Sequence, residues 1–173
     1  MCGSIFIETP RLLVKNPSMT DFSALRMLQQ DPEVMRYMGG PRDEARVIAN
    51  VDKLQSHLTK HGFSFGPVYD KETRQFIGRA GLVKLDFDDK SPDVEFGFFI
   101  LKPYWNKGFA TELGDAFMKY AFESLGVPRV YVTFDPENGA VRQVCEKLGM
   151  HFDRASPYVA LEKTQHFYVK EKV

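Results

Sequence analysis

The sequence has few cysteines, no surplus of charge and no long apolar run. Only two cysteines, Cys2 and Cys145, occur among 173 residues, and their spacing fits neither a disulfide framework nor a cysteine metal site. No apolar stretch approaches the roughly 18 residues that a membrane span requires, and the first residues do not resemble a secretory signal. We therefore expect a cytoplasmic protein that has no membrane partner.

The charge balance argues against a polyanionic partner. Lys and Arg together number 23, as do Asp and Glu, so the formal net charge at pH 7 is zero. Proteins that bind nucleic acid usually carry a basic surplus, and we therefore expect no nucleic-acid partner. A local basic pocket is compatible with this balance.

The histidines do not predict a metal site. His57 and His61 are spaced i, i+4 on an expected helix, a spacing that can hold a metal ion. No third ligand lies near them in the sequence, so a solvated helix face is the favoured interpretation. We predict no metal.

Hydrophobic periodicity predicts one domain, residues 1–173, without an internal repeat or a linker. The expected strands are a short one at 11–14, within the segment 5–15, and 63–69, 75–85, 93–101, 129–134, 150–159 and 165–170. Helices are expected to begin at Thr20–Asp21, to run from about 43 to 61, to follow Gly108 as far as Gly126, and to begin near Asn138, with a short helical turn at 34–38. An antiparallel run of strands followed by alternating strands and helices predicts a mixed sheet with helices on both faces.

Residues 103–112 connect an expected strand to an expected helix through Gly108. The first N–H groups of a helix have no partner within it, and the helix dipole makes that end electropositive. Glycine has no Cβ and lets a ligand approach the backbone closely. The stretch therefore predicts either an ordinary turn or a site for a phosphate-bearing ligand.

The chain resembles the GNAT superfamily of acyl-CoA-dependent N-acyltransferases, and more narrowly the RimJ/RimL-like branch that acetylates ribosomal-protein N-termini. The resemblance rests on an ordered series of segments: 8–12, 31–35, 76–82, 94–98, 104–112, 136–138 and 146–149. It implies an α+β GNAT fold whose central mixed sheet is mostly antiparallel and has about seven strands. It also implies that acetyl-CoA is the co-substrate.

The resemblance assigns cofactor contacts to three segments. The backbone of Phe99, Ile100 and Leu101 is expected to pair with the pantetheine arm as an added strand pairs with a sheet edge. The residues expected around the diphosphate are Lys107, Gly108, Phe109, Ala110 and Thr111. Asn138 matches the family's asparagine near the thioester, although it also stands where a helix N-cap would.

Two positions depart from the family pattern. Asn106 stands where the family usually has glycine, but asparagine is among the residues that best tolerate a left-handed backbone. Val141 replaces a frequent serine, so a hydroxyl that could reach the cofactor thiol is absent.

The chemistry of acyl transfer requires a base for the amine and a way for the thiolate to leave. Glu95, on the expected strand before the loop, is our candidate base, and its alternative role is to solvate the end of the sheet. Cys145 occupies the position at which many GNAT enzymes carry a tyrosine acid. It is either a contact to the cofactor sulfur or, more commonly for such a residue, a core side chain.

Two functions of different class follow. The first is an N-acetyltransferase that moves an acetyl group from acetyl-CoA to a primary amine by direct attack in a ternary complex. The second is an acyl-CoA-binding protein of the same fold with little or no catalysis, acting as a sensor or scaffold. The acceptor is left open between a small-molecule amine and a protein N-terminus, and the protein between a monomer and a homodimer.

Overall fold

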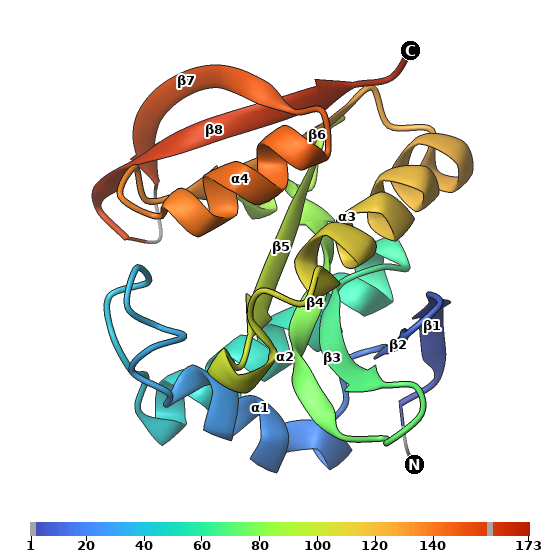
Figure 1. Ribbon diagram of the computed structural model, residues 1–173, viewed down its shortest axis with the longest axis vertical. Coiled ribbons are helices and arrows are strands. Elements are labelled where there is room, and N and C mark those ends of the chain that lie inside the picture. The colour runs from blue at the N-terminus through green and yellow to red at the C-terminus, as the bar shows by residue number, and fades with distance from the viewer. Residues whose placement is uncertain (1–2, 159–160) are drawn as a thin grey trace. The chain divides into compact units, whose positions relative to one another are not determined.

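The computed structural model describes residues 3–158 and 161–173 and has an α+β architecture (Figure 1). The strands are β1 (Ile5–Glu8), β2 (Leu12–Lys15), β3 (Phe65–Asp70), β4 (Phe76–Lys84), β5 (Val94–Ile100), β6 (Arg129–Phe134), β7 (His151–Tyr158) and β8 (Lys163–Glu171). The helices are α1 (Phe22–Gln29), α2 (Glu44–His61), α3 (Phe109–Lys119) and α4 (Gly139–Lys147), with a π-helical turn η4 (Tyr120–Leu125) and short 3-10 turns η1 (Met19–Asp21), η2 (Leu85–Phe87) and η3 (Lys102–Tyr104).

The strands follow the hydrogen-bonded order β1-β2-β3-β4-β5-β6-β8-β7. The pair β5–β6 is parallel, with Val94 opposite Val130, whereas β1–β2, β2–β3, β3–β4, β6–β8 and β7–β8 are antiparallel. The expected α+β fold with a mostly antiparallel sheet is confirmed. It has eight strands because the segment 5–15, in which one short strand was expected at 11–14, is a hairpin of β1 and β2: the Leu12 N–H donates to Thr9 Oγ1 at 3.0 Å where the chain turns at Pro10.

The chain forms two compact units, residues 1–81 with 98–109 and residues 82–97 with 110–173. Strands β4 and β5 each contribute to both units. A single domain over residues 1–173 therefore stays a prediction.

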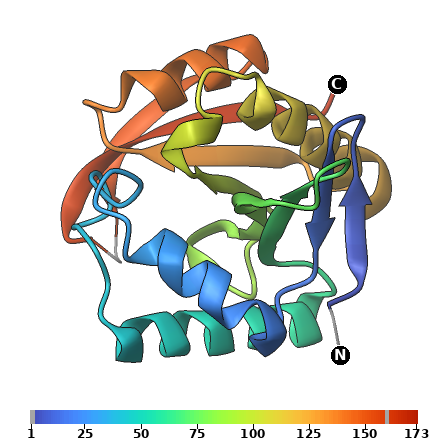
Figure 2. The same cartoon turned by 60° about the horizontal axis from the view of Figure 1, so that its bottom comes forward.

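The first unit is organised around α2, which lies alongside α1 (Figure 2). Asp43 caps its N-terminus by accepting a 2.8 Å hydrogen bond from the Arg46 N–H. Gly62 ends it in a left-handed conformation with φ 81°. The buried face of α2 carries Val47, Val51 and Leu54, which are fully buried. This periodicity and the glycine C-cap are the signals that predicted the helix from about 43 to 61.

In the second unit α4 packs against β6, and α3 lies close to the end of α4. A Cβ on Gly114 of α3 would stand 2.4 Å from Leu148 Cδ1 at the end of α4, so any larger residue at position 114 would require the Leu148 side chain to shift. The rings of Phe96 and Phe117 lie 5.6 Å apart between centroids, joining β5 to α3. Burial of such large apolar side chains is the main favourable term in folding of the unit.

Residues 34–38 lie in a run of hydrogen-bonded turns, in which the Met35 N–H donates to the Asp31 carbonyl at 3.0 Å and the Met38 N–H donates to the Met35 carbonyl at 2.9 Å, in keeping with the expected short helical turn. One local prediction was wrong. His57 is buried, and its Nδ1 lies 2.7 Å from the Phe63 carbonyl oxygen, so it does not belong to a solvated helix face. Among residues 3–158 and 161–173, none of the helices combines the length and apolarity that crossing a bilayer demands.

Candidate active site

The loop that joins β5 to α3 contains two residues with left-handed backbone. Asn106 has φ 59° and Gly108 has φ 77°, and α3 begins at the next residue, Phe109. A left-handed residue beside a right-handed one turns successive N–H groups toward one side, an arrangement that binds anions. The left-handed geometry that Asn106 was expected to tolerate is the geometry it adopts.

The surroundings of this loop suit a phosphate. Lys107 and Gly108 are exposed. Among the described residues outside its chain neighbours, the one atom within 4 Å of where a Gly108 Cβ would stand is Arg11 Nη2, at 3.5 Å. The open side of the loop and its basic side chains are therefore compatible with the diphosphate of coenzyme A.

Backbone groups at the end of β5, which were expected to pair with the pantetheine arm, already have partners within the chain. The Leu101 N–H donates to the Ile77 carbonyl at 2.9 Å, and the Leu101 carbonyl accepts from the Tyr104 N–H at 2.9 Å. The Phe99 carbonyl faces β4, because a Cβ on Gly78 would stand 2.0 Å from it. The N–H and the carbonyl of Leu101 are thus both hydrogen-bonded within the chain. Of the three residues that were expected to pair with the pantetheine arm, Ile100 is therefore the favoured one.

The Ile100 carbonyl is itself in contact with a side chain. It accepts a 2.6 Å hydrogen bond from Trp105 Nε1–H. Trp105 is 40% exposed, so this hydrogen bond lies at the surface and not within a core.

Glu95 is a buried carboxyl of the second unit. It is buried on β5, and its Oε1 accepts a 2.7 Å hydrogen bond from Thr133 Oγ1 on β6. Burial raises the pKa of Glu95 to about 7; the Thr133 hydrogen bond lowers it, and the negative charge of Asp86 raises it. A carboxyl with a pKa of about 7 exchanges its proton near neutral pH, as a general base must.

Asn138 is confirmed as a helix cap. Its side-chain oxygen accepts from the Val141 N–H at 3.4 Å at the start of α4. Its own N–H donates to the Asp135 carbonyl at 2.8 Å, and the Asp135 carboxylate is paired with Lys163. This turn holds Asn138 in place, while its contact to a cofactor stays a prediction.

Cys145 lies in the core of the second unit. Its side chain is fully buried, and burial raises the pKa of its thiol to about 12. Such a thiol is protonated and inert at neutral pH. The packing role is favoured over contact with the cofactor sulfur. Cys2 lies outside the described residues.

The candidate residues fall into both units. The first unit contains Phe99, Ile100, Leu101, Lys107, Gly108 and Phe109, and the second contains Glu95, Ala110, Thr111, Asn138 and Cys145. Two further residues, Thr133 and Arg11, were not assigned a role from the sequence. The register of β5 on β6, with Glu95 opposite Tyr131, is what brings Thr133 to Glu95.

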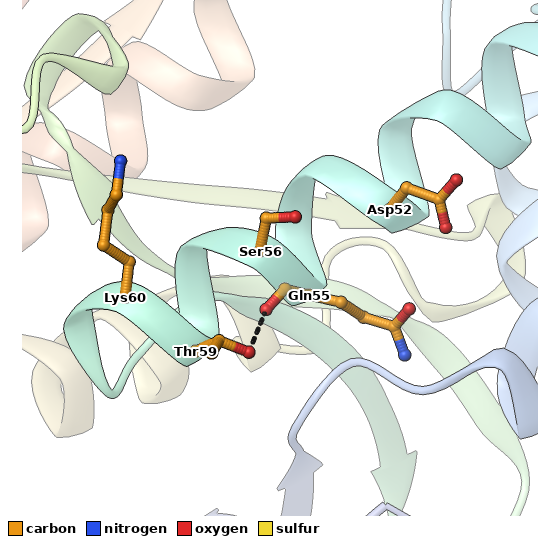
Figure 3. A pocket seen from close by; sticks show the side chains of 5 residues that line it. All are labelled: Asp52, Gln55, Ser56, Thr59 and Lys60. Carbon is orange, nitrogen blue, oxygen red and sulfur yellow. Dashed lines mark hydrogen bonds between the residues drawn. The ribbon is translucent and has the colours of Figure 1, made fainter.

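Two further observations do not indicate a metal site or a ligand site. Within residues 3–158 and 161–173 no group of three metal-ligating side chains lies together. Figure 3 shows a hollow over α2 whose lining side chains are Asp52, Gln55, Ser56, Thr59 and Lys60. All five come from one face of one helix and none is buried, so this is a surface hollow.

Relatives of this chain in sequence include two bacterial proteins. The YkkB protein of Bacillus subtilis (strain 168) is 30% identical over 128 residues, which are 74% of this chain and 74% of that protein. The spermidine N(1)-acetyltransferase of Escherichia coli (strain K12) is 29% identical over 135 residues, which are 75% of this chain and 67% of that enzyme.

Solved structures share the fold over nearly the whole chain. A GNAT-family acetyltransferase from Bacillus anthracis superposes with a TM-score of 0.80 and 25% identity, covering 96% of this chain and 98% of that one. The ribosomal-protein-S5-alanine acetyltransferase from Vibrio fischeri has the same fold, with a TM-score of 0.77 and 14% identity over 98% and 97% of the two chains. The expected similarity to ribosomal-protein acetyltransferases is thus found at the level of the fold.

The family match agrees with the strand, loop and helix described above. The acetyltransferase (GNAT) domain matches residues 11–151, from the residue before β2 to the first residue of β7. The match includes the loop with Asn106 and Gly108, and both strands that hold Glu95 and Thr133. The chain therefore belongs to the acetyltransferase (GNAT) domain family and is an acyltransferase.

Proposed function

We propose that this protein transfers an acetyl group from acetyl-CoA to a primary amine by direct attack within a ternary complex, with Glu95 as the base. The observation that carries the proposal is the buried Glu95 carboxyl, one oxygen of which is bound by Thr133 while the other, Oε2, has no partner among the described residues. A buried carboxylate oxygen without a partner is costly unless a ligand or water uses it.

We propose that coenzyme A contacts the loop between β5 and α3 and the end of β5. The backbone of residues 107–111 would hold the diphosphate, since Gly108 and the start of α3 present N–H groups to an open side. Ile100 would pair with the pantetheine arm. When bound, acetyl-CoA supplies the acetyl group as an activated thioester.

Glu95 would then remove the proton that an attacking amine must lose. The C–N bond forms as the C–S bond breaks, the amine proton passes to Glu95 directly or through water, and the thiolate takes a proton from water. An α-amino group has a pKa of about 8 and a lysine side chain about 10.4. A base with a pKa of about 7 is better matched to the first.

The acceptor proposed is a small-molecule amine or a protein N-terminus. The relative from Escherichia coli is named for spermidine, a polyamine, and the neighbour from Vibrio fischeri for an alanine of a ribosomal protein. Both acceptors offer a primary amine, which is the group that the proposed chemistry requires.

The test is thiol release from acetyl-CoA with a panel of polyamines and peptides that have free N-termini. We expect release with at least one acceptor, and a loss of about 100-fold in Glu95→Gln. Glu123→Gln, an exposed glutamate of the same unit, is the matched control and should keep full activity. Equal rates in Glu95→Gln and wild type would reject Glu95 as the base.

A second candidate, an acyl-CoA-binding protein with little catalysis, is favoured by one observation. Cys145 is fully buried and residue 141 is valine, so neither position offers a thiolate the donor that related enzymes often carry. Tight coenzyme A binding without thiol release on any acceptor would support this function.

A further inference from the structure

We propose that Arg11 is a positioning residue. It would hold the loop between β5 and α3, residues 101–108, in the conformation that binds the diphosphate. The inference rests on the proposed function, because it concerns how the same loop would receive coenzyme A. Arg11 precedes β2, far from the loop in sequence, and all the contacts that follow lie within the first unit.

The guanidinium of Arg11 lies against the end of the loop and the first residue of α3. Its Nη1 donates a 2.9 Å hydrogen bond to the Lys107 carbonyl. Its Nη2 is 3.5 Å from where a Gly108 Cβ would stand. Its Cζ lies 4.5 Å from the centroid of the Phe109 ring, a distance at which a cation is attracted to the ring face.

The backbone of Arg11 is itself held in place. Its carbonyl accepts a 2.8 Å hydrogen bond from the Lys71 N–H. The next residue, Leu12, is fully buried in β2. The guanidinium therefore reaches the loop from a rigid strand, while the ring of Phe109 beneath it is 7% exposed and well packed.

Peptide geometry connects this contact to anion binding. The Lys107 carbonyl and the Gly108 N–H belong to one trans peptide unit, in which they point in opposite directions. Because Arg11 binds the carbonyl, the Gly108 N–H must point away from Arg11, toward the open side of the loop.

Glycine cannot maintain this orientation alone. Gly108 tolerates many backbone conformations, so rotation of the 107–108 peptide would be easy without the Arg11 hydrogen bond. A rotated peptide would present the Lys107 oxygen to the ligand, and that oxygen repels a phosphate. Arg11 thus stabilises the one orientation that offers a donor.

Lysine would not replace arginine in this role. The planar guanidinium can donate to the Lys107 carbonyl and stack on Phe109 at once, whereas an ammonium is a compact, strongly hydrated point charge. The two side chains carry the same charge, so comparing them separates positioning from simple attraction of the phosphates.

The test compares wild type, Arg11→Met, Arg11→Lys and the control Arg46→Met, which changes an exposed arginine of α2. Coenzyme A affinity is measured by calorimetry. Acetyl transfer is measured with acetyl-CoA and with S-acetylpantetheine, which carries the thioester arm without the diphosphate. Far-UV circular dichroism and thermal unfolding monitor the fold, and Arg11→Lys remains informative if Arg11→Met does not fold.

We expect Arg11→Met and Arg11→Lys each to weaken coenzyme A binding about tenfold, the effect of losing one charge-assisted hydrogen bond. KM for acetyl-CoA should rise in parallel, while kcat/KM for S-acetylpantetheine and all values for Arg46→Met stay at wild-type levels. Wild-type affinity of Arg11→Lys for coenzyme A would overturn the positioning role. A loss of kcat/KM with S-acetylpantetheine as large as the loss with acetyl-CoA would also overturn it. If wild type binds coenzyme A and Arg11→Met binds it equally, only the role of Arg11 fails; if wild type binds none, the proposed function fails.

Discussion

The Thr133 hydroxyl binds one oxygen of the Glu95 carboxyl and leaves the other for a different partner. Thr133 Oγ1 donates to Glu95 Oε1 at 2.7 Å, and Oε2 is buried without a partner among the described residues. A neutral hydroxyl orients the carboxylate without the strong pKa depression that an adjacent cation would cause. Glu95 is thereby both fixed in position and able to take a proton near pH 7.

The rate of transfer should depend on the ionisation of Glu95. Its pKa is raised to about 7, and a general base acts only when ionised. We expect kcat/KM to rise with pH through about 7 in wild type, after correction for the ionisation of the amine. Glu95→Gln should lack this rise; persistence of the same inflection would assign it to another group.

Stability should fall as pH rises between about 4.5 and 7, the pKa of a free glutamate and that of Glu95. In this window the folded state holds a proton that the unfolded state has lost, so folding is favoured at the acidic end. The contribution is on the order of 3 kcal/mol. Urea unfolding of wild type and Glu95→Gln at pH 5 and pH 8 measures it, because glutamine removes this titration. A difference in stability between the two proteins that does not change with pH would contradict the raised pKa.

Thr133→Val should move the pH dependence in a defined direction. The Thr133 hydrogen bond lowers the pKa of Glu95, so its loss should raise that pKa further. In Thr133→Val the rise in kcat/KM should shift to higher pH. In Thr133→Ser, which retains the hydroxyl, the rise should occur at the same pH as in wild type. A Thr133→Val profile that coincides with wild type would show that the hydrogen bond does not influence the titration.

Gly108→Ala should weaken cofactor binding, and Gly126→Ala is its matched control. Both glycines have left-handed backbone, with φ 77° and 67°, and a Cβ at Gly126 would meet nothing within 4 Å among the described residues. Each alanine should cost about 1 kcal/mol of stability because of its positive φ. Only Gly108→Ala should also reduce coenzyme A affinity in calorimetry; equal affinity in both variants would argue against the loop as the diphosphate site.

Trp105 should report cofactor binding by fluorescence. It is the one tryptophan in the sequence, and its Nε1–H is bonded to the Ile100 carbonyl that we assign to the pantetheine arm. Coenzyme A should displace the indole and change its emission, with the same saturation as calorimetry. Trp105→Phe should still bind but give no signal. Saturated binding by wild type with unchanged emission would mean that the indole stays on Ile100.

Local signals account for the elements that were predicted well. Strand β6 has the expected bounds, and α2 begins after Asp43 and ends at Gly62 because these caps act on neighbouring backbone groups. The hairpin at Pro10 was missed because a single apolar segment gives no sign of where a side chain such as Thr9 will turn the chain. His57 was misjudged for a similar reason: its burial depends on Phe63, in the segment that follows the helix.

The family, the strand-to-helix turn at Gly108 and the candidate base Glu95 could be predicted without a structure, since these predictions depend on residue types in a fixed order along the chain. The three-dimensional packing was needed to find that Thr133 donates to Glu95, that Arg11 donates to the Lys107 carbonyl and that Trp105 donates to the Ile100 carbonyl. The first two contacts join residues far apart in the sequence, and the third depends on how the chain turns after β5. Periodicity and spacing describe the local backbone, whereas hydrogen bonds between side chains and distant backbone groups are set by strand register and packing.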